Sequence, residues 1–93
     1  MRRIKPTARF RRDFKREKKG PHGSRLDALL TDVTDLLAAD TPLPVRFRDH
    51  PLSGIWNDCR DCHIRPDLVL IYRKPYDDTL ELVRLGSHSE LGF

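Results

Sequence analysis

Histidines are the residues of this chain best suited to acid–base chemistry, because imidazole gains and loses protons near neutral pH. His50, His63 and His88 lie far apart along the sequence, each in a loop or at the end of a predicted strand. A single histidine at such a position is more often structural than catalytic. Three imidazoles meeting at one end of a sheet would instead provide the acid and the base of a proton-transfer reaction. His22, in a Pro-His-Gly loop, is expected to be solvated and to have no role.

The segment from Cys59 to His63 has the Cys-x-x-Cys-His spelling of covalent haem attachment. It falls in a predicted strand, where residues three apart point to opposite faces, so the two thiols would not meet one porphyrin edge. The same geometry argues against a tetrahedral zinc site that includes both cysteines and His63. Met1 is the sole methionine, so the usual distal haem ligand is missing. We therefore expect no haem, no metal and no other cofactor.

Positive charge is concentrated at the start of the sequence. Residues 1–25 contain eleven Lys and Arg against two acidic residues, a net charge of +9, whereas residues 26–93 contain seven against twelve, a net charge of −5. Such a basic segment attracts phosphates or an acidic protein surface. No apolar run reaches the roughly 20 residues of a membrane span. Two cysteines are too few for a disulfide framework, and no apolar secretion signal follows the basic start, which predicts a cytoplasmic protein.

The elements that must position these histidines begin with a short edge strand predicted over residues 2–6. Thr7 can cap a helix that continues to about Lys19. Phe10 and Phe14 share one face of that helix, and Lys and Arg cover most of the remainder. A Gly-Pro pair directly after it ends the helix.

A second helix has the strongest periodicity in the sequence. Ser24 is its predicted cap, and the apolar residues that follow recur with helical spacing at Leu26, Leu29, Leu30, Val33, Leu36 and Leu37. This face must pack against a core. Residues 41–54 then form a long connection rich in proline, and long ordered loops often carry function.

The remaining segments predict strands over residues 56–64, 68–72 and 79–85, joined by short turns as an antiparallel meander. Together with the N-terminal strand they predict an α+β fold, in which the small sheet packs against two N-terminal helices. A chain of 93 residues has no room for a second core, so we expect one domain spanning residues 1–93.

Four motifs occur in order within the C-terminal half. They are the H-P-L-x-G loop from His50, the H-I-x-P-D turn from His63 to Asp67, an apolar strand ending in Tyr72, and the G-S-H-S-x-L segment that contains His88. At these separations they resemble the YafQ branch of the RelE/ParE toxin superfamily. The similarity is close over residues 43–92, whereas the first 40 residues share only the pattern of a strand and two helices.

The resemblance implies a bacterial type II toxin that cuts mRNA in the ribosomal A site and is neutralised by a tightly bound antitoxin. The family's active-site positions correspond here to His50, His63, Asp67 and His88. A terminal aromatic residue also contributes in the family, and Phe93 is displaced by one position from its usual place. The expected fold is RelE-like. The expected partners are the ribosome with its mRNA and a cognate DinJ- or RelB-like antitoxin, with the free toxin a monomer and the complex a hetero-oligomer.

The residue types also suit RNA cleavage without a metal, which needs a base for the 2′-hydroxyl, an acid for the departing 5′-oxygen, and cations near the phosphate. We expect His88 to be the acid and either His50 or His63 to be the base. Asp67 would orient or charge a neighbouring imidazole. Products would carry a 2′,3′-cyclic phosphate and a 5′-hydroxyl.

Arg60 and Arg84 are the candidates for holding the scissile phosphate, with ordinary surface charge as the alternative. Trp56 and Tyr72 could stack on bases, although packing in the core of a half-buried strand is the simpler expectation. The basic first helix could contact ribosomal RNA, bind an acidic antitoxin segment, or be a solvated face. Two other functions stay open, a ParE-like poison of DNA gyrase and an inactive toxin that serves only as a co-repressor with its antitoxin.

Overall fold

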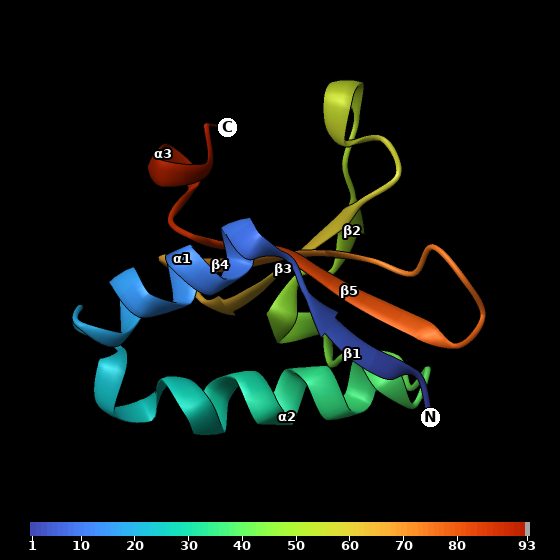
Figure 1. Cartoon of the computed structure of the whole chain (residues 1–93), viewed down its shortest axis with the longest axis horizontal. Helices are drawn as coiled ribbons and strands as arrows, with labels where there is room; N and C mark the ends of the chain where they lie inside the picture. Colours follow the sequence, from blue (N-terminus) through green and yellow to red (C-terminus); the bar gives the residue numbers. More distant parts are fainter. Residues whose placement is uncertain (93) are drawn as a thin grey trace.

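The computed structural model describes residues 1–92. It contains a five-stranded sheet with one long helix against one face and another helix along one edge (Figure 1). In chain order the elements are β1 (Arg3–Pro6), α1 (Ala8–Lys18), α2 (Leu26–Ala38), β2 (His50–Pro51), β3 (Arg60–Arg65), β4 (Leu68–Arg73), β5 (Thr79–Gly86) and α3 (His88–Leu91), with short 3-10 turns at Gly23–Arg25, Val45–Phe47 and Gly54–Trp56. Phe93, expected near the site, lies outside the described residues.

The sheet has the strand order β1-β5-β4-β3-β2. The pairs β2–β3, β3–β4 and β4–β5 are antiparallel, and β1 pairs in parallel with β5. The predicted α+β fold is therefore confirmed, including the N-terminal strand and the meander. Strand β2 adds a short outer edge that the sequence pattern did not indicate.

Helix α1 continues from β1 along the edge of the sheet. The Thr7 hydroxyl accepts a hydrogen bond from Phe10 N–H at 3.0 Å, which confirms Thr7 as the cap. Beyond the end of β1, the Asp13 carboxylate accepts a hydrogen bond from the Leu85 N–H at 3.0 Å. A side chain of α1 thereby satisfies the backbone of β5 where β1 no longer pairs with it.

Helix α2 packs its apolar stripe against one face of the sheet (Figure 1). Phe10 of α1 belongs to the same core cluster, together with alternate residues of the three meander strands. The predicted Ser24 cap is wrong, because Ser24 lies inside the 3-10 turn and the N-cap position is occupied by Arg25 without a side-chain hydrogen bond. The preceding 3-10 turn continues directly into the helix and replaces a conventional cap.

The two cysteines lie in different apolar clusters. Cys62 belongs to the cluster under α2, and Cys59 belongs to the smaller cluster on the other face of the sheet. Both thiols are buried and free, and burial raises the pKa of Cys59 to about 11. The geometric argument against one haem or zinc centre that uses both thiols agrees with this placement.

Two element boundaries differ from the sequence prediction. The strand expected over residues 56–64 begins only at Arg60, because a 3-10 turn at Gly54–Trp56 and a turn through Asn57 come first. Gly54 adopts a left-handed conformation with φ +66°, which fits the turn that ends the preceding loop. The one-turn helix α3 was not predicted. Among residues 1–92, no helix has the length and apolar character that crossing a bilayer requires.

Candidate functional site

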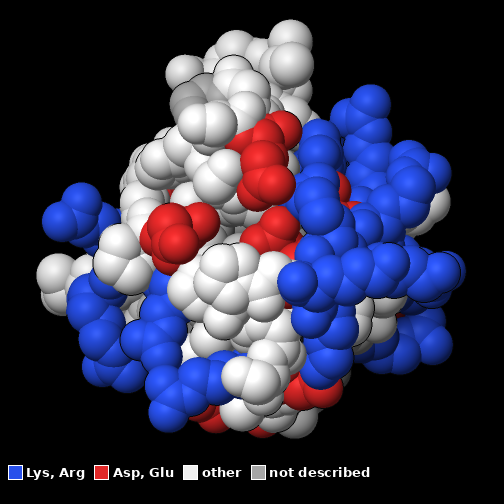
Figure 2. Space-filling view, turned by 90° about the vertical axis from the view of Figure 1, so that its left-hand side faces the viewer, with Lys and Arg blue, Asp and Glu red and all other residues white. Residues whose placement is uncertain are grey.

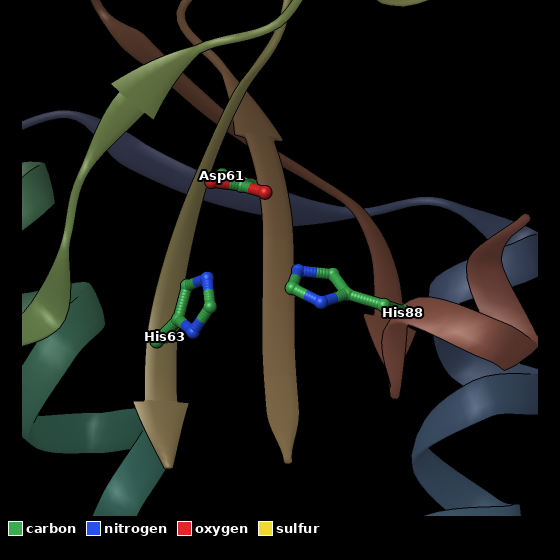
Figure 3. A group of neighbouring side chains, drawn as sticks. All are labelled: Asp61, His63 and His88. Atoms are coloured by element: carbon green, nitrogen blue, oxygen red, sulfur yellow. The ribbon is translucent and has the colours of Figure 1, made fainter. Parts of the chain in front are cut away.

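His63 and His88 meet on the sheet face opposite to α2, although 24 residues separate them in the chain. Their ring centroids are 5.0 Å apart and the rings are tilted by 72°, an edge-to-face arrangement. Figure 3 shows Asp61 and His63 projecting from β3, with His88 reaching toward them from the start of α3. The meander brings two of the three predicted histidines together with a carboxylate that the sequence analysis did not single out.

Asp61 is the most unusual group in this cluster. It is 1% exposed, and neither of its carboxylate oxygens has a hydrogen-bond partner in the part of the chain that the structure describes. Burial raises the pKa of the Asp61 carboxyl, against the opposing effect of the three nearby histidines. Burying a carboxylate without hydrogen-bond partners costs free energy, so the presence of Asp61 at this position points to a function.

His50 approaches the same carboxylate from strand β2. The antiparallel pairing places His50 opposite Asp61, and His50 Nδ1 lies 3.0 Å from Asp61 Oδ1. Its hydrogen bond, however, goes to the Arg48 carbonyl oxygen at 2.8 Å. The contact with Asp61 is therefore an electrostatic one between closely spaced groups. All three predicted histidines surround Asp61.

The loop before His50 is tied to the sheet through Asp49. Its carboxylate accepts hydrogen bonds from the Tyr72 hydroxyl and, at 3.2 Å, from Arg60 Nε. Tyr72 is 2% exposed, so its packing role is confirmed over base stacking. Arg60 alternates with Asp61 along β3 and holds the His50 loop from the other face of the sheet. Trp56 is partly buried against the smaller apolar cluster.

A cavity of about 600 Å³ opens beside His63 and His88. Its wall contains His63 and His88. The 3-10 turn and the residue after it add Arg46, Phe47 and Arg48, and the end of β3 with the residue after it adds Ile64, Arg65 and Pro66. Its size is in the range of sites for small ligands, and a nucleotide is of that order. None of the three arginines forms an ion pair with any residue among 1–92.

Three residues predicted for the site stand elsewhere. Arg60 is paired with Asp49, and Arg84 makes two contacts with Asp13 at 2.7 and 3.2 Å, so neither arginine lines the cavity. Asp67 is exposed and pairs with His22 at 2.8 Å, rather than with an imidazole of the cluster. His22, expected to be solvated and to have no role, is instead partly buried and paired with this carboxylate.

The local structure after β5 sets the position of His88. Helix α3 begins at His88 with a capping box, in which the Ser87 hydroxyl accepts from Glu90 N–H (3.1 Å) and Glu90 accepts from Ser87 N–H (2.9 Å). The Ser-x-x-Glu spacing of these residues is a readable helix-start signal. This spacing could have predicted the start of α3 from the sequence.

Asp61, His63 and His88 also have the donor atoms of a metal site. One possible ligand atom from each lies within 4.8 Å of the others. Two imidazoles and a carboxylate suit a transition-metal ion, and such a set commonly leaves positions open. The residues therefore fit a cation as well as proton transfer.

Basic residues cover a large part of the surface. Figure 2 shows Lys and Arg in a dense band along one side of the molecule, where α1 lies, and in a second group on the opposite side, with acidic residues between them. The residues of α1 that are exposed and basic are Arg9, Arg11, Arg12, Lys15, Arg16 and Lys18. The α1 face and the cavity wall are thus both rich in positive charge.

Comparison with known proteins places these features in context. The model of a family described as bacterial toxin of type II toxin-antitoxin system, YafQ, matches residues 2–92. Two proteins named mRNA interferase toxin YafQ, from two Escherichia coli strains, are similar to the chain. One is 44% identical over 59 residues, 63% of each chain, so that alignment spans less than two thirds of the relative. The other is 38% identical over 90 residues, 95% of this chain and 92% of the relative.

Solved structures resemble the whole described fold. A metal-bound toxin from Helicobacter pylori is 46% identical with a TM-score of 0.86, covering 98% of this chain and 99% of that one. The toxin in the Escherichia coli DinJ–YafQ complex is 34% identical with a TM-score of 0.83, covering 98% of both chains. The similarity therefore extends over both helices and the entire sheet.

Proposed function

This chain belongs to the YafQ family of bacterial type II toxins, and we propose that it is an mRNA interferase that cleaves message on the ribosome by acid–base catalysis. Two relatives are named mRNA interferase toxin, which supports mRNA as the substrate. The observation that carries the proposed chemistry is the convergence of His50, His63 and His88 on the buried carboxylate of Asp61. Attack by the 2′-oxygen on phosphorus, with departure of the 5′-oxygen, requires no resident metal.

His50 is the general base in this proposal. Its Nδ1–H donates to the Arg48 carbonyl oxygen, so a neutral ring carries its lone pair on Nε2. That nitrogen accepts the 2′-hydroxyl proton. Asp61 then stabilises the His50 imidazolium, since Asp61 Oδ1 lies 3.0 Å from His50 Nδ1. In many catalytic sites a carboxylate beside a histidine base stabilises the imidazolium that forms when the base takes a proton.

His88 is the general acid and protonates the departing 5′-oxygen. His63 packs edge-on against it, and burial lowers the pKa of His63 although Asp61 acts in the opposite direction. The lowered pKa of His63 favours its neutral form, which avoids charge repulsion with the proton that a general acid at His88 must carry. The active-site role that the resemblance implies for Asp67 is not part of this mechanism, because its carboxylate is exposed and pairs with His22 at 2.8 Å.

Arg46, Arg48 and Arg65 hold the RNA phosphates in place of the arginines first expected. They line the cavity beside the catalytic histidines, and their guanidinium groups are not occupied by acidic partners within residues 1–92. Arg60 and Arg84 are occupied by Asp49 and Asp13. Guanidinium groups bind phosphate oxygens bidentately, which suits this position.

The partners follow from the family and the charge. A complex with the antitoxin DinJ is known for the Escherichia coli relative, and the basic face over α1 suits either an acidic antitoxin segment or ribosomal RNA. Antitoxin bound over this face would block ribosome contact. The free toxin is expected to be a monomer and the neutralised form a hetero-oligomer.

Primer extension on ribosome-bound mRNA tests the function directly. Wild type should cut within codons only when ribosomes are present, and His50→Ala and His88→Ala should each lose about 100-fold or more in rate. His22→Ala is the matched control, because it removes a histidine outside the cluster, and it should retain cleavage. The products should end in a 2′,3′-cyclic phosphate and a 5′-hydroxyl.

Other outcomes separate the alternatives. Loss of cleavage in EDTA, with recovery on adding a divalent metal, would contradict metal-independent catalysis. Inhibition by added copper or zinc is instead expected, because a cation on Asp61, His63 and His88 occupies the imidazole lone pairs. Induced DNA damage without cut mRNA would indicate a gyrase poison, and the absence of both would indicate an inactive co-repressor.

A further inference from the structure

Arg16 reaches from α1 across the edge of β5 and contacts several groups at once. Its Nη2 donates to the Leu85 carbonyl oxygen at 2.9 Å, and its Nη1 lies 3.2 Å from Asp13 Oδ1. Its Nε lies 3.1 Å from Glu90 Oε2 and 3.0 Å from Glu17 Oε2. The other basic residues of α1 make fewer such contacts. Arg11 and Arg12, for example, form no side-chain ion pair within residues 1–92.

Glu90 connects this arginine to the catalytic end of the chain. One of its oxygens completes the capping box of α3, and the other faces Arg16. Helix α3 has a single turn, and His88 is its first residue. The orientation of so short a helix depends on its cap and on contacts with neighbouring elements, since its own hydrogen bonds are few.

Gly86 leaves the space that this contact needs. A Cβ atom at that position would lie 2.7 Å from Arg16 Nη2 and 3.1 Å from Glu90 Oε1. The closeness of both groups to one backbone position shows that the arginine, the glutamate and the end of β5 form a tightly packed junction. His88 follows this junction two residues later.

We propose that Arg16 is a positioning residue for His88 and acts through the carboxylate of Glu90. The proposal rests on the proposed nuclease function for its kinetic consequence, and on geometry alone for its structural one. Arg16 holds α3 against β5, which keeps the His88 imidazole beside His63 and Asp61. Without Arg16, α3 stays folded through its capping box but loses its fixed orientation on the sheet.

A double-mutant cycle tests the link. Arg16→Met retains the aliphatic stem, and Glu90→Gln retains the capping box because glutamine serves equally at that position. Each variant should lower kcat for ribosome-dependent cleavage about tenfold with little change in KM, as expected for a misplaced catalytic group. The double variant should be no slower than Arg16→Met alone, because both changes remove the same contact. Lys74→Met, which removes one cation that pairs with Asp40 away from α1 and α3, should keep wild-type kcat.

A spectroscopic measurement makes the two proposals separable. In the free toxin at one fixed pH, Arg16→Met and Glu90→Gln should shift the imidazole NMR signals of His88 and weaken its NOE to His63, while Lys74→Met leaves both unchanged. This readout needs no substrate, so it remains valid if wild type proves unable to cleave mRNA, which would overturn only the nuclease proposal. Unmoved His88 signals, or rate losses that multiply in the double variant, would overturn the role of Arg16.

Discussion

At the residue scale, Asp61 combines a position at the centre of the histidine cluster with an unfavourable environment. Its oxygens are buried and lack hydrogen-bond partners among residues 1–92, and burial raises the pKa of this carboxyl. A raised pKa in the folded state means that the ionised form is disfavoured by folding. Stability linked to Asp61 is therefore greatest at low pH and declines as pH rises through the folded pKa.

Asp61→Asn should separate activity from stability. We expect kcat to fall about 100-fold, because the imidazolium of His50 loses its nearest anion. The free energy of unfolding at pH 7 should be equal to that of wild type or about 1 kcal/mol higher, since a buried charge becomes a neutral amide. Urea denaturation and single-turnover cleavage measure the two quantities. A variant that loses both stability and activity would show that Asp61 is merely structural.

Individual site residues were predictable only in part. The histidines could be named because imidazole chemistry and the motifs agree. The neighbours of each residue were not readable, because the alternation of β3 decides that Asp61 faces the cluster while Arg60 faces Asp49. Likewise, the fold decides that Asp67 meets His22, which lies in a loop far away in sequence.

At the element scale, Asp13 fastens α1 to β5. It is 3% exposed and receives hydrogen bonds from Arg84 and from the Leu85 N–H. Burial alone would raise the pKa of this carboxyl, but the hydrogen bonds from Arg84 and Leu85 outweigh burial and lower it below 3.8. The stabilisation is therefore fully present above pH 4 and is lost as pH falls through the lowered folded pKa.

Asp13→Asn should accordingly cost about 3 kcal/mol at neutral pH, because it leaves Arg84 without its anion. The difference from wild type should shrink when both proteins are unfolded in urea at pH 3. Asp27→Asn is a suitable control, since within residues 1–92 the ion pair of that exposed residue is with Lys18 at the surface. An equal loss at both pH values would assign the effect to packing.

Element types were easier to predict than their boundaries. The apolar stripe of α2 and the Thr7 cap carry strong local signals, and both elements formed as expected. Residues 54–59 combine turn formers with the β-prone Ile55 and Trp56, so composition alone placed the strand too early. Strand β2 has two residues and exists only through its pairing with β3, which no local pattern encodes.

At the scale of the whole molecule, residues 1–25 carry a net charge of +9, and Figure 2 shows a dense basic band on one side and a second basic group on the other. Replacing Arg11, Arg12 and Lys15 by Glu should weaken ribosome association while the free energy of unfolding stays near that of wild type. Each lost phosphate contact should reduce the slope of log affinity against log salt by about 0.7 to 0.9. Sedimentation with ribosomes over a salt series provides the measurement. Unchanged binding would leave the basic face to the antitoxin or to solvent.

The parallel pairing of β1 with β5 has a consequence for when this protein becomes harmful. Strand β5 is translated after every other strand, yet it lies between β1 and β4. Neither α1 nor the first strand can dock before β5 emerges, and His88 follows still later. Folds with many such non-local pairings fold slowly. We therefore expect the histidine cluster, which includes His88, to form only after the whole sheet has been synthesised.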